Sequence, residues 1–522
     1  MRLISRKFGL ALSLGVIALG FAQAANAATT YYYQWTGVTD SDLTKSTNWT
    51  TGRGPATFNG TYDLTRLYVT VTQTGTPAPA KAPLIYTEAQ GHTTYSTTAA
   101  RALYVQQGEM QINGGTFETC GAVNPDAIGY SAYAATLTIN GGNYLNTGAA
   151  ASNGFIVHYM NTGDSTLNVM NGTFAANYIA FNATASNAPN SSGNATVNLE
   201  NGGVIETGAV YEVANATSTM VSTFNFNGGT LKARVAGSFS GLDYAYVKTG
   251  GAIIDTNSLN YAIGQNLLAG TEGSGGLTKN GEGKLTITSA GNTYTGATAV
   301  NLGKLVVNGS IAASSGVSVA AGASLGGSGT VSVISGAGSV GPGSSPGILT
   351  ASSIDPSAGT DFAFELTAAA PTYSSATASG NDVLHLTGAT PIASALTSEN
   401  VVDVYLGVAS VAAGDSFLGG FYEDAATDFT SAISGASYNF FVLGDGAGTH
   451  AYNGTNYYTL GEYNSALSVD VATVASTADF ATGTVNGGVT QFTIAAVPEP
   501  ATAVMLLGGL LGLVAYAWRK RK

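Results

Sequence analysis

The residues of this chain that could do chemistry form a small basic cluster with two nearby carboxylates: Lys232, Arg234, Lys248, Asp243 and Asp255. Lys232 and Arg234 are two positions apart, so both side chains would point to the same face of a β-strand. A Lys or Arg in such a place could serve as a base or could hold an acidic ligand. The alternative is that paired charges cover a solvated strand face. We therefore treat Lys232, Arg234 and Lys248 as candidate ligand-binding residues.

Other catalytic patterns are missing from the sequence. The four histidines do not occur in HxH, HExxH or any Cys/His cluster, which gives zinc catalysis no support. The sequence also has no Gly-x-Ser-x-Gly motif between a strand and a helix, no phosphate-binding loop and no Gly-Gly-x-Gly-x-Asp calcium repeat. We predict no catalytic residue, no metal site and no cofactor.

The elements that position the basic cluster are short strands in a repeating pattern. A run of alternating strand residues followed by Asn-Gly occurs five times, and its asparagines are Asn113, Asn140, Asn171, Asn201 and Asn227. A period of 20 to 50 residues is typical of solenoids, propellers and arrays. Within one unit, Leu137 and Ile139 should point inward, whereas Thr136 and Thr138 should point outward.

Two structures could explain the Asn-Gly sites. An Asn-Gly pair favours a tight β-hairpin, but hairpins alone do not explain the regular longer period. One turn of a β-helix does explain it, with two or three short strands joined by bends that need positive φ at Gly or Asn. We therefore predict an all-β protein with a β-helix at 99–353, a cap region at 28–98 and a β-rich C-terminal cap domain at 354–496.

A different repeat begins near residue 270. Residues 270–310 include Leu277-Thr278-Lys279-Asn280-Gly281, and the whole stretch resembles the autotransporter-associated β-strand repeat. This family occurs in passenger-like regions of bacterial surface proteins, and the resemblance implies a right-handed parallel β-helix. Many β-helices cut acidic polysaccharides, so a polysaccharide lyase or hydrolase using the Lys232 cluster is the alternative by analogy of fold.

The N-terminus has the three parts of a secretory signal. Arg2, Arg6 and Lys7 precede an apolar stretch at 8–21, and an A-x-A site ends at Ala27. The sequence predicts a signal peptide at 1–27, which signal peptidase removes after Ala27.

The C-terminus, residues 497–522, has three parts as well. Pro498, Glu499 and Pro500 are followed by an uncharged apolar run at 501–518, about long enough for one transmembrane helix. The tail, Arg519, Lys520, Arg521 and Lys522, should remain on the cytoplasmic side.

This arrangement resembles the PEP-CTERM sorting signal of bacterial envelope proteins. The resemblance implies that an exosortase cuts near Pro498, Glu499 and Pro500, so that the chain occupies the inner membrane only transiently. The mature chain would then be at the cell surface or extracellular. A plain C-terminal membrane anchor is the alternative.

Charge excludes one class of partner. The chain has 18 basic and 30 acidic residues, and without the two terminal signals 11 basic and 29 acidic residues remain. Such a surface repels polyanions, so we predict no nucleic-acid partner. Because PEP-CTERM proteins are associated with exopolysaccharide-producing bacteria, we expect a structural or adhesive envelope or matrix protein that binds extracellular polysaccharide.

Overall fold

The computed structural model describes three N-terminal strands and most of the chain from residue 83 to residue 497. The described residues are 32–35, 60–63, 66–69 and 83–497, except for gaps at 98–102, 106–107, 122–123, 130–132, 149–152, 160–161, 183–190, 215–217, 344–345, 368–372, 375–376, 379–380, 425–427 and 477–486. The predicted signal peptide with Ala27 lies outside them. So do Pro498, Glu499, Pro500, the predicted transmembrane helix and the tail Arg519, Lys520, Arg521 and Lys522.

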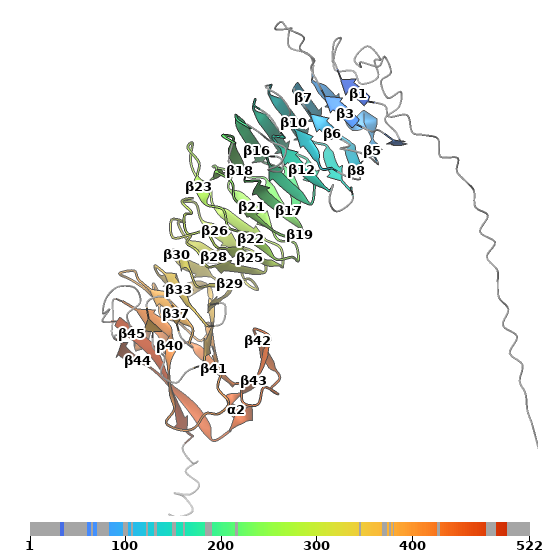
Figure 1. Cartoon of the computed structure of the whole chain (residues 1–522). Helices are drawn as coiled ribbons and strands as arrows, with labels where there is room; N and C mark the ends of the chain where they lie inside the picture. The colour runs from blue at the N-terminus through green and yellow to red at the C-terminus, as the bar shows by residue number, and fades with distance from the viewer. Residues whose placement is uncertain are drawn as a thin grey trace, which may run out of the picture.

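The prediction of an all-β protein is confirmed. The described residues form strands, with only two single-turn α-helices, α1 (Thr430–Ile433) and α2 (Leu460–Tyr463). Within the described ranges, no helix has the length and hydrophobicity needed to cross a membrane. Figure 1 shows an elongated stack of strands, with β1 near one end and β42 to α2 at the other.

Most strands belong to three ladders, in which each strand pairs in parallel with a strand 15 to 40 residues further along the chain. The first ladder contains β2 (Gly60–Asp63), β5 (His92–Thr97), β8 (Thr116–Gly121), β11 (Asn143–Asn146), β14 (Thr173–Ala175), β17 (Val204–Glu212), β19 (Thr230–Ser240), β21 (Ala252–Asp255), β24 (Leu277–Asn280), β26 (Thr298–Val300), β28 (Val317–Val319), β31 (Ile334–Gly336) and β34 (Ile354–Asp355).

The second ladder contains β1 (Tyr32–Trp35), β3 (Arg66–Val69), β6 (Leu103–Val105), β9 (Asp126–Ile128), β12 (Gly154–Val157), β15 (Tyr178–Phe181), the second halves of β17 and β19, β22 (Tyr261–Ile263), β25 (Lys284–Ile287), β27 (Lys304–Val307), β29 (Ser324–Gly327), β32 (Ser339–Pro342), β35 (Asp361–Leu366), β39 (Val401–Leu406) and β41 (Ser437–Val442). The third contains β4 (Leu84–Tyr86), β7 (Gly108–Ile112), β10 (Ala135–Asn140), β13 (Ser165–Met170), β16 (Asn194–Glu200), β18 (Val221–Asn227), β20 (Tyr244–Val247) and β23 (Leu267–Ala269).

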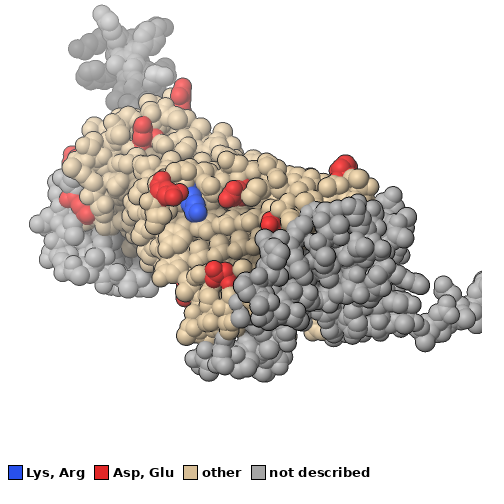
Figure 2. All heavy atoms as spheres, turned by 90° about the horizontal axis from the view of Figure 1, so that it is seen from above, with Lys and Arg blue, Asp and Glu red and all other residues tan. Residues whose placement is uncertain are grey.

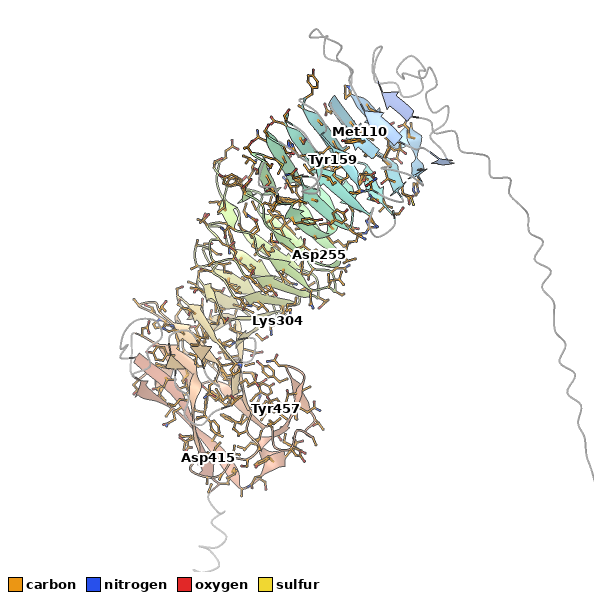
Figure 3. The ribbon with its side chains drawn as sticks, in the orientation of Figure 1. Met110, Tyr159, Asp255, Lys304, Asp415 and Tyr457 are labelled. Carbon is orange, nitrogen blue, oxygen red and sulfur yellow. The ribbon has the colours of Figure 1, made fainter. Side chains whose placement is uncertain are left out.

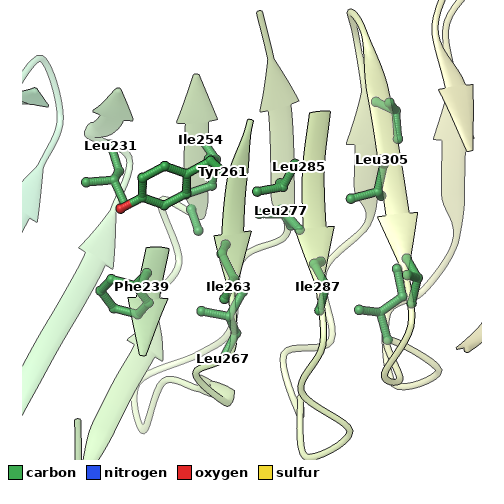
Figure 4. Packing of buried hydrophobic residues seen from close by; sticks show 14 of the residues in the cluster. Leu231, Phe239, Ile254, Tyr261, Ile263, Leu267, Leu277, Leu285, Ile287 and Leu305 are labelled. Atoms are coloured by element: carbon green, nitrogen blue, oxygen red, sulfur yellow. The ribbon is translucent and has the colours of Figure 1, made fainter. Parts of the chain in front are cut away.

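The core lies between the ladders. In the third ladder Leu137 pairs with Leu167, and Leu137 and Ile139 are fully buried, while Thr136 and Thr138 remain partly exposed, as predicted. Figure 4 shows the same stacking in the second ladder, where Phe239, Ile263 and Ile287 follow one another from strand to strand. Each such buried side chain contributes roughly 1.5–3 kcal/mol, so the stack of apolar columns is the main source of stability.

The Asn-Gly sites are corners between ladders. Each one connects a strand of the third ladder to a strand of the first, as between β10 and β11, so the hairpin alternative is wrong for them. The corner backbones of successive turns touch. A Cβ on Gly142 would lie 2.8 Å from the N and O atoms of Gly114, which leaves no room for a larger residue.

Antiparallel strands close the second ladder and one further set of parallel strands. A further set of parallel strands, β30 (Thr330–Val331), β33 (Ile348–Ala351), β38 (Val383–Leu386) and β40 (Ser416–Glu423), is closed by antiparallel β45 (Gly487–Ala496), which pairs with β44 (Leu467–Ser476). The last strand of the second ladder, β41, pairs with antiparallel β43 (Thr455–Thr459), and β43 pairs with β42 (His450–Tyr452). A small hairpin, β36 (Tyr373–Ser374) and β37 (Thr377–Ala378), completes the sheets.

A buried lysine ties three successive turns of the chain together. Lys279 occupies an inward position of β24 and is fully buried. Its Nζ donates to Thr256 Oγ1 of the preceding turn, to the carbonyls of Asn280 and Gly281, and to the carbonyl of Leu302 in the following turn, at 2.5–3.1 Å. Burial lowers the pKa of Lys279 to about 8, while Asp255 and Glu282 act in the opposite direction.

We predict that Lys279→Met destabilises the protein by about 2 kcal/mol, because the change removes the ammonium donor from the partly buried carbonyls of Gly281 and Leu302. The carbonyl of Asn280 keeps the N–H of Thr256 as a donor. Lys284→Met is the matched control, since Lys284 is exposed and lies in the same repeat. The free energy of unfolding of Lys284→Met should stay within about 0.5 kcal/mol of the wild-type value. Denaturant unfolding of both variants measures the difference, and equal stabilities would show that the ammonium does not hold the turns together.

Candidate functional site

The candidate residue Lys232 lies in a column of alternating charges on the outer side of the first ladder. Register places Glu206, Lys232 and Asp255 on consecutive strands, β17, β19 and β21. Lys232 Nζ contacts Glu206 Oε1 at 2.9 Å, and the two side chains are 35% and 32% exposed. An ion pair at such an exposed position contributes about 0–1 kcal/mol.

The electrostatics of this column do not favour a lysine base. The hydrogen bond that Lys232 donates to Glu206, and then the charge of Glu206, raise the pKa of Lys232, and the charge of Asp255 adds to this effect. A general base must be unprotonated near the working pH, so a raised pKa keeps Lys232 in its inactive, charged form. The column is better suited to holding strands in register or to binding an anionic group.

The other members of the predicted cluster have different neighbours. The pairing of β19 is irregular after Ala233, and Arg234 there donates from Nη2 to the carbonyl of Asn146 at 3.2 Å. Lys248 lies in the corner after β20, where its backbone bonds to Phe226. Asp243 accepts from the backbone of Ser222 at the other end of β20. The structure therefore brings Lys232 and Asp255 together, and ligand binding by Arg234 and Lys248 remains a prediction.

A second candidate surface is the outer face of the third ladder, which we call the polar array. It has two columns that register aligns from strand to strand. The first column is Thr136, Thr166, Thr196 and Thr223, and the second is Thr138, Asn168, Asn198 and Asn225. These eight side chains are uncharged, and adjacent members of a column are about 4.8 Å apart. On the preceding strand, β7, the first column continues with Glu109 and the second with Gln111.

The amides of the second column form a hydrogen-bonded ladder. Asn225 Nδ2 donates to Asn198 Oδ1 and Asn198 Nδ2 donates to Asn168 Oδ1, both at 2.8 Å, and Asn168 Nδ2 donates to Thr138 Oγ1 at 3.3 Å. Each amide has two donors and two acceptor lone pairs, so this ladder fixes the side chains and leaves capacity for a ligand. The sequence carries this signal as Thr-x-Thr or Thr-x-Asn in each unit, a repetition of similar faces that is suited to many weak contacts.

Two tyrosines continue the polar array on the next strand. Tyr244 is in register with Thr223, and Tyr246 with Asn225. Their rings stack at 5.6 Å between centroids and 13° between planes, and Tyr244 is 42% exposed. An exposed aromatic face beside aligned hydroxyls and amides is suited to a sugar ring, because the ring packs while the polar groups bond to hydroxyls.

Surface charge agrees with an uncharged or cationic ligand. Figure 2 shows a face of the protein on which acidic side chains are scattered among uncharged residues and little basic surface is visible. Among the residues that the structure describes, no group of three or more His, Cys, Asp or Glu side chains could hold a metal ion.

Buried carboxyls in the C-terminal part are a third candidate for chemistry. Asp382 accepts from the backbone N–H groups of Gly347 and Glu365, both at 2.8 Å, and Tyr457 donates to Glu365 Oε1 at 3.3 Å. Burial nevertheless raises the pKa of Asp382 to about 8. Figure 3 places Tyr457 beyond Lys304 at this end of the stack. Asp382 is only 1% exposed, so the arrangement is a structural network rather than an open site.

Comparisons with known families give two matches. The model of the Passenger-associated-transport-repeat matches residues 277–307, and that of the PEP-CTERM protein-sorting motif matches residues 496–522. Both resemblances noted in the sequence are thereby confirmed, and neither family is catalytic. No curated protein and no solved structure matches the chain. The sorting motif indicates an exported protein processed by an exosortase and is consistent with a membrane-anchored intermediate.

Buried carboxyls should make stability fall as the pH rises. Burial raises the pKa of Glu423 to about 7 from an ordinary value of 4.5, so the folded state binds this proton more tightly than the unfolded state. The resulting stability is present below pH 4.5 and is lost as the pH rises through 7. We expect the free energy of unfolding to decrease by about 1–3 kcal/mol from this group.

Glu423→Gln tests whether Glu423 causes this pH dependence, because glutamine has the shape of glutamate but does not titrate. Thermal unfolding between pH 4.5 and pH 8 should depend less on pH in Glu423→Gln than in the wild type. Glu399→Gln removes an exposed carboxyl and should leave the slope unchanged. An equal dependence of stability on pH in Glu423→Gln and the wild type would contradict the assignment of this effect to Glu423.

Proposed function

We propose that this chain is a structural or adhesive protein of the bacterial envelope or extracellular matrix that binds extracellular polysaccharide. The sorting motif at 496–522 supports processing by an exosortase after passage through the inner membrane. The signal sequence ending at Ala27 supports export by way of signal peptidase. The processed chain would be at the cell surface or outside the cell.

The proposed architecture is a right-handed parallel β-helix. Three parallel ladders with a return of the chain every 15 to 40 residues support it, as does the repeat matched at 277–307. We propose that the exported chain consists of an N-terminal cap region at 28–98, a β-helix at 99–353 and a C-terminal β domain at 354–496. Parallel pairing continues across residue 353, as in β32 with β35, so the β-helix and the C-terminal β domain would share one stack of strands.

The observation that carries the binding proposal is the polar array. Its threonines and asparagines recur at the strand spacing, so a linear polymer that crosses several strands would meet the same groups repeatedly. One hydroxyl or amide contact is weak, but linked contacts act as intramolecular events and raise avidity by about 10²–10⁴. The neutral character of the array suits a neutral polysaccharide, and Tyr244 supplies a stacking surface.

The sorting proposal can be tested in the host. Replacement of Val497, Pro498, Glu499 and Pro500 by alanine should leave the protein in the inner membrane, because the processing enzyme loses its recognition segment. Fractionation and immunoblotting measure the shift. Replacing the exposed residues Asn464 and Ser465 by alanine is a nearby control and should not change the distribution. Equal release of the two variants into the medium would contradict the proposal.

The binding proposal can be tested with the purified protein and the host's exopolysaccharide. Thr166→Glu combined with Thr223→Glu places charge on two strands of the polar array and should weaken binding at least tenfold. Thr278→Glu combined with Thr286→Glu makes the same change on the first and second ladders, so its affinity should match the wild type. Equal losses in both double variants would mean that the array is not the binding surface.

Light scattering of the mixture over hours distinguishes binding from catalysis. Particle mass should rise and then stay constant, because a matrix protein binds the polymer without consuming it. A steady fall in polymer mass would instead support the lyase or hydrolase alternative, and Lys232→Met and Arg234→Met would then identify the groups involved.

A further inference from the structure

The C-terminal part of the chain contains a pocket that the polar array does not include. It lies between the end of β41, strand β43 and helix α2, has a volume of about 300 Å³, and is lined by Ala409, Gly444, Asp445, Tyr458, Glu462 and Tyr463. These elements lie together at the end of the molecule opposite β1 (Figure 1). The lining thus combines two aromatic rings with two carboxylates.

The two rings flank a glycine. A Cβ on Gly444 would lie 3.3 Å from the Tyr458 ring and 3.6 Å from the Tyr463 ring, so both rings approach the backbone there. Gly444 has φ of +57°, which a residue with a side chain adopts at a cost. The glycine therefore keeps space open between the two aromatic faces.

The two carboxylates are held in place by hydrogen bonds. Asp445 Oδ1 accepts from the Tyr458 hydroxyl at 2.8 Å and from the backbone of Ala447 at 3.0 Å. Glu462 Oε2 accepts from the N–H and the hydroxyl of Thr459, both at 2.8 Å. These bonds lower the pKa of both carboxyls, so both are ionised at neutral pH. Within the described part of the chain, these hydrogen bonds leave Asp445 Oδ2 and Glu462 Oε1 available to a ligand.

The chain around the pocket is poor in basic residues, and His450 Nε2 lies 3.8 Å from Glu462 Oε2. Between Lys304 and Arg519 the sequence has no Lys or Arg, whereas residues 305–497 contain 14 Asp and Glu residues. An anionic ligand would find no Lys or Arg partner in this half of the chain. A cation, by contrast, is attracted by the general field as well as by the pocket.

We propose that this pocket binds a protonated amine carried on a sugar ring, as in a glucosamine unit of an amino-sugar polymer. Aromatic faces attract ammonium groups and pack against sugar rings, and the two carboxylates accept the ammonium N–H donors. The carboxylates select for the free amine, because an N-acetylated sugar has the same ring but no charge. The polar array would bind a neutral polymer, whereas the pocket would bind a cationic sugar. Binding at the pocket does not depend on the polar array.

Titration calorimetry with the purified protein tests the proposal, using glucosamine and N-acetylglucosamine as probes at a pH where the amine is protonated. Glucosamine should bind at least tenfold more tightly than N-acetylglucosamine. Glu462→Gln should weaken glucosamine binding at least tenfold, and it keeps the fold because glutamine also completes the cap of α2 at this position. Asp470→Asn, which removes an exposed carboxylate outside the pocket, should bind like the wild type.

Three results would overturn the proposal. Equal binding of the two sugars would mean that the rings alone bind and that the charge is irrelevant. Equal losses in Glu462→Gln and Asp470→Asn would mean that the general field, not the pocket, attracts the amine. The absence of glucosamine binding to the wild type would rule out the site directly. The binding test of the polar array uses different residues and a neutral polymer, so either proposal can fail alone.

Discussion

Parallel pairing in register is the constraint on which the rest of this structure depends. It places equivalent residues of successive turns about 4.8 Å apart, so each side chain must pack beside the equivalent side chain of the next turn. Apolar residues satisfy this directly, as Leu137 does with Leu167. Amides satisfy it by bonding to each other, as Asn198 does with Asn168. Like charges repel each other, and Lys232 lies between two acidic residues. Lys284 is nevertheless in register with Lys304, and burial followed by the charge of Lys284 lowers the pKa of Lys304.

The parts of the fold that could be predicted from the sequence are local ones. Strand alternation has a period of two, so Leu137 and Ile139 could be placed inside without knowledge of any partner. The Asn-Gly sites marked corners because positive φ is a property of single residues. Neither inference required the register between turns, and both are confirmed.

The candidate sites were less predictable because their contacts cross from one turn to the next. Lys232 and Arg234 share strand parity, but the irregular pairing of β19 after Ala233 separates their surroundings. The amide ladder depends on a register that spans 27 to 30 residues, and Gly-rich strands specify register weakly. Lys279 has the parity of a core residue, and only the structure reveals that its ammonium contacts the Thr256 hydroxyl of the preceding turn and carbonyls of its own and the following turn.

A stack of parallel strands must also end without leaving a free edge for other chains. Here the second ladder ends at β41, which pairs with antiparallel β43. The further parallel set ends at β40, which pairs with antiparallel β45. The hairpin of β42 and β43 also covers the outer face of the second ladder, where the rings of Tyr405 and Tyr452 stack at 4.0 Å. The same hairpin leads into α2, so the element that closes the stack also builds the pocket between Tyr458 and Tyr463. The last described strand, β45, also belongs to this C-terminal part, whereas the polar array lies toward β1 (Figure 1). The length of the stack therefore separates the polar array from the pocket.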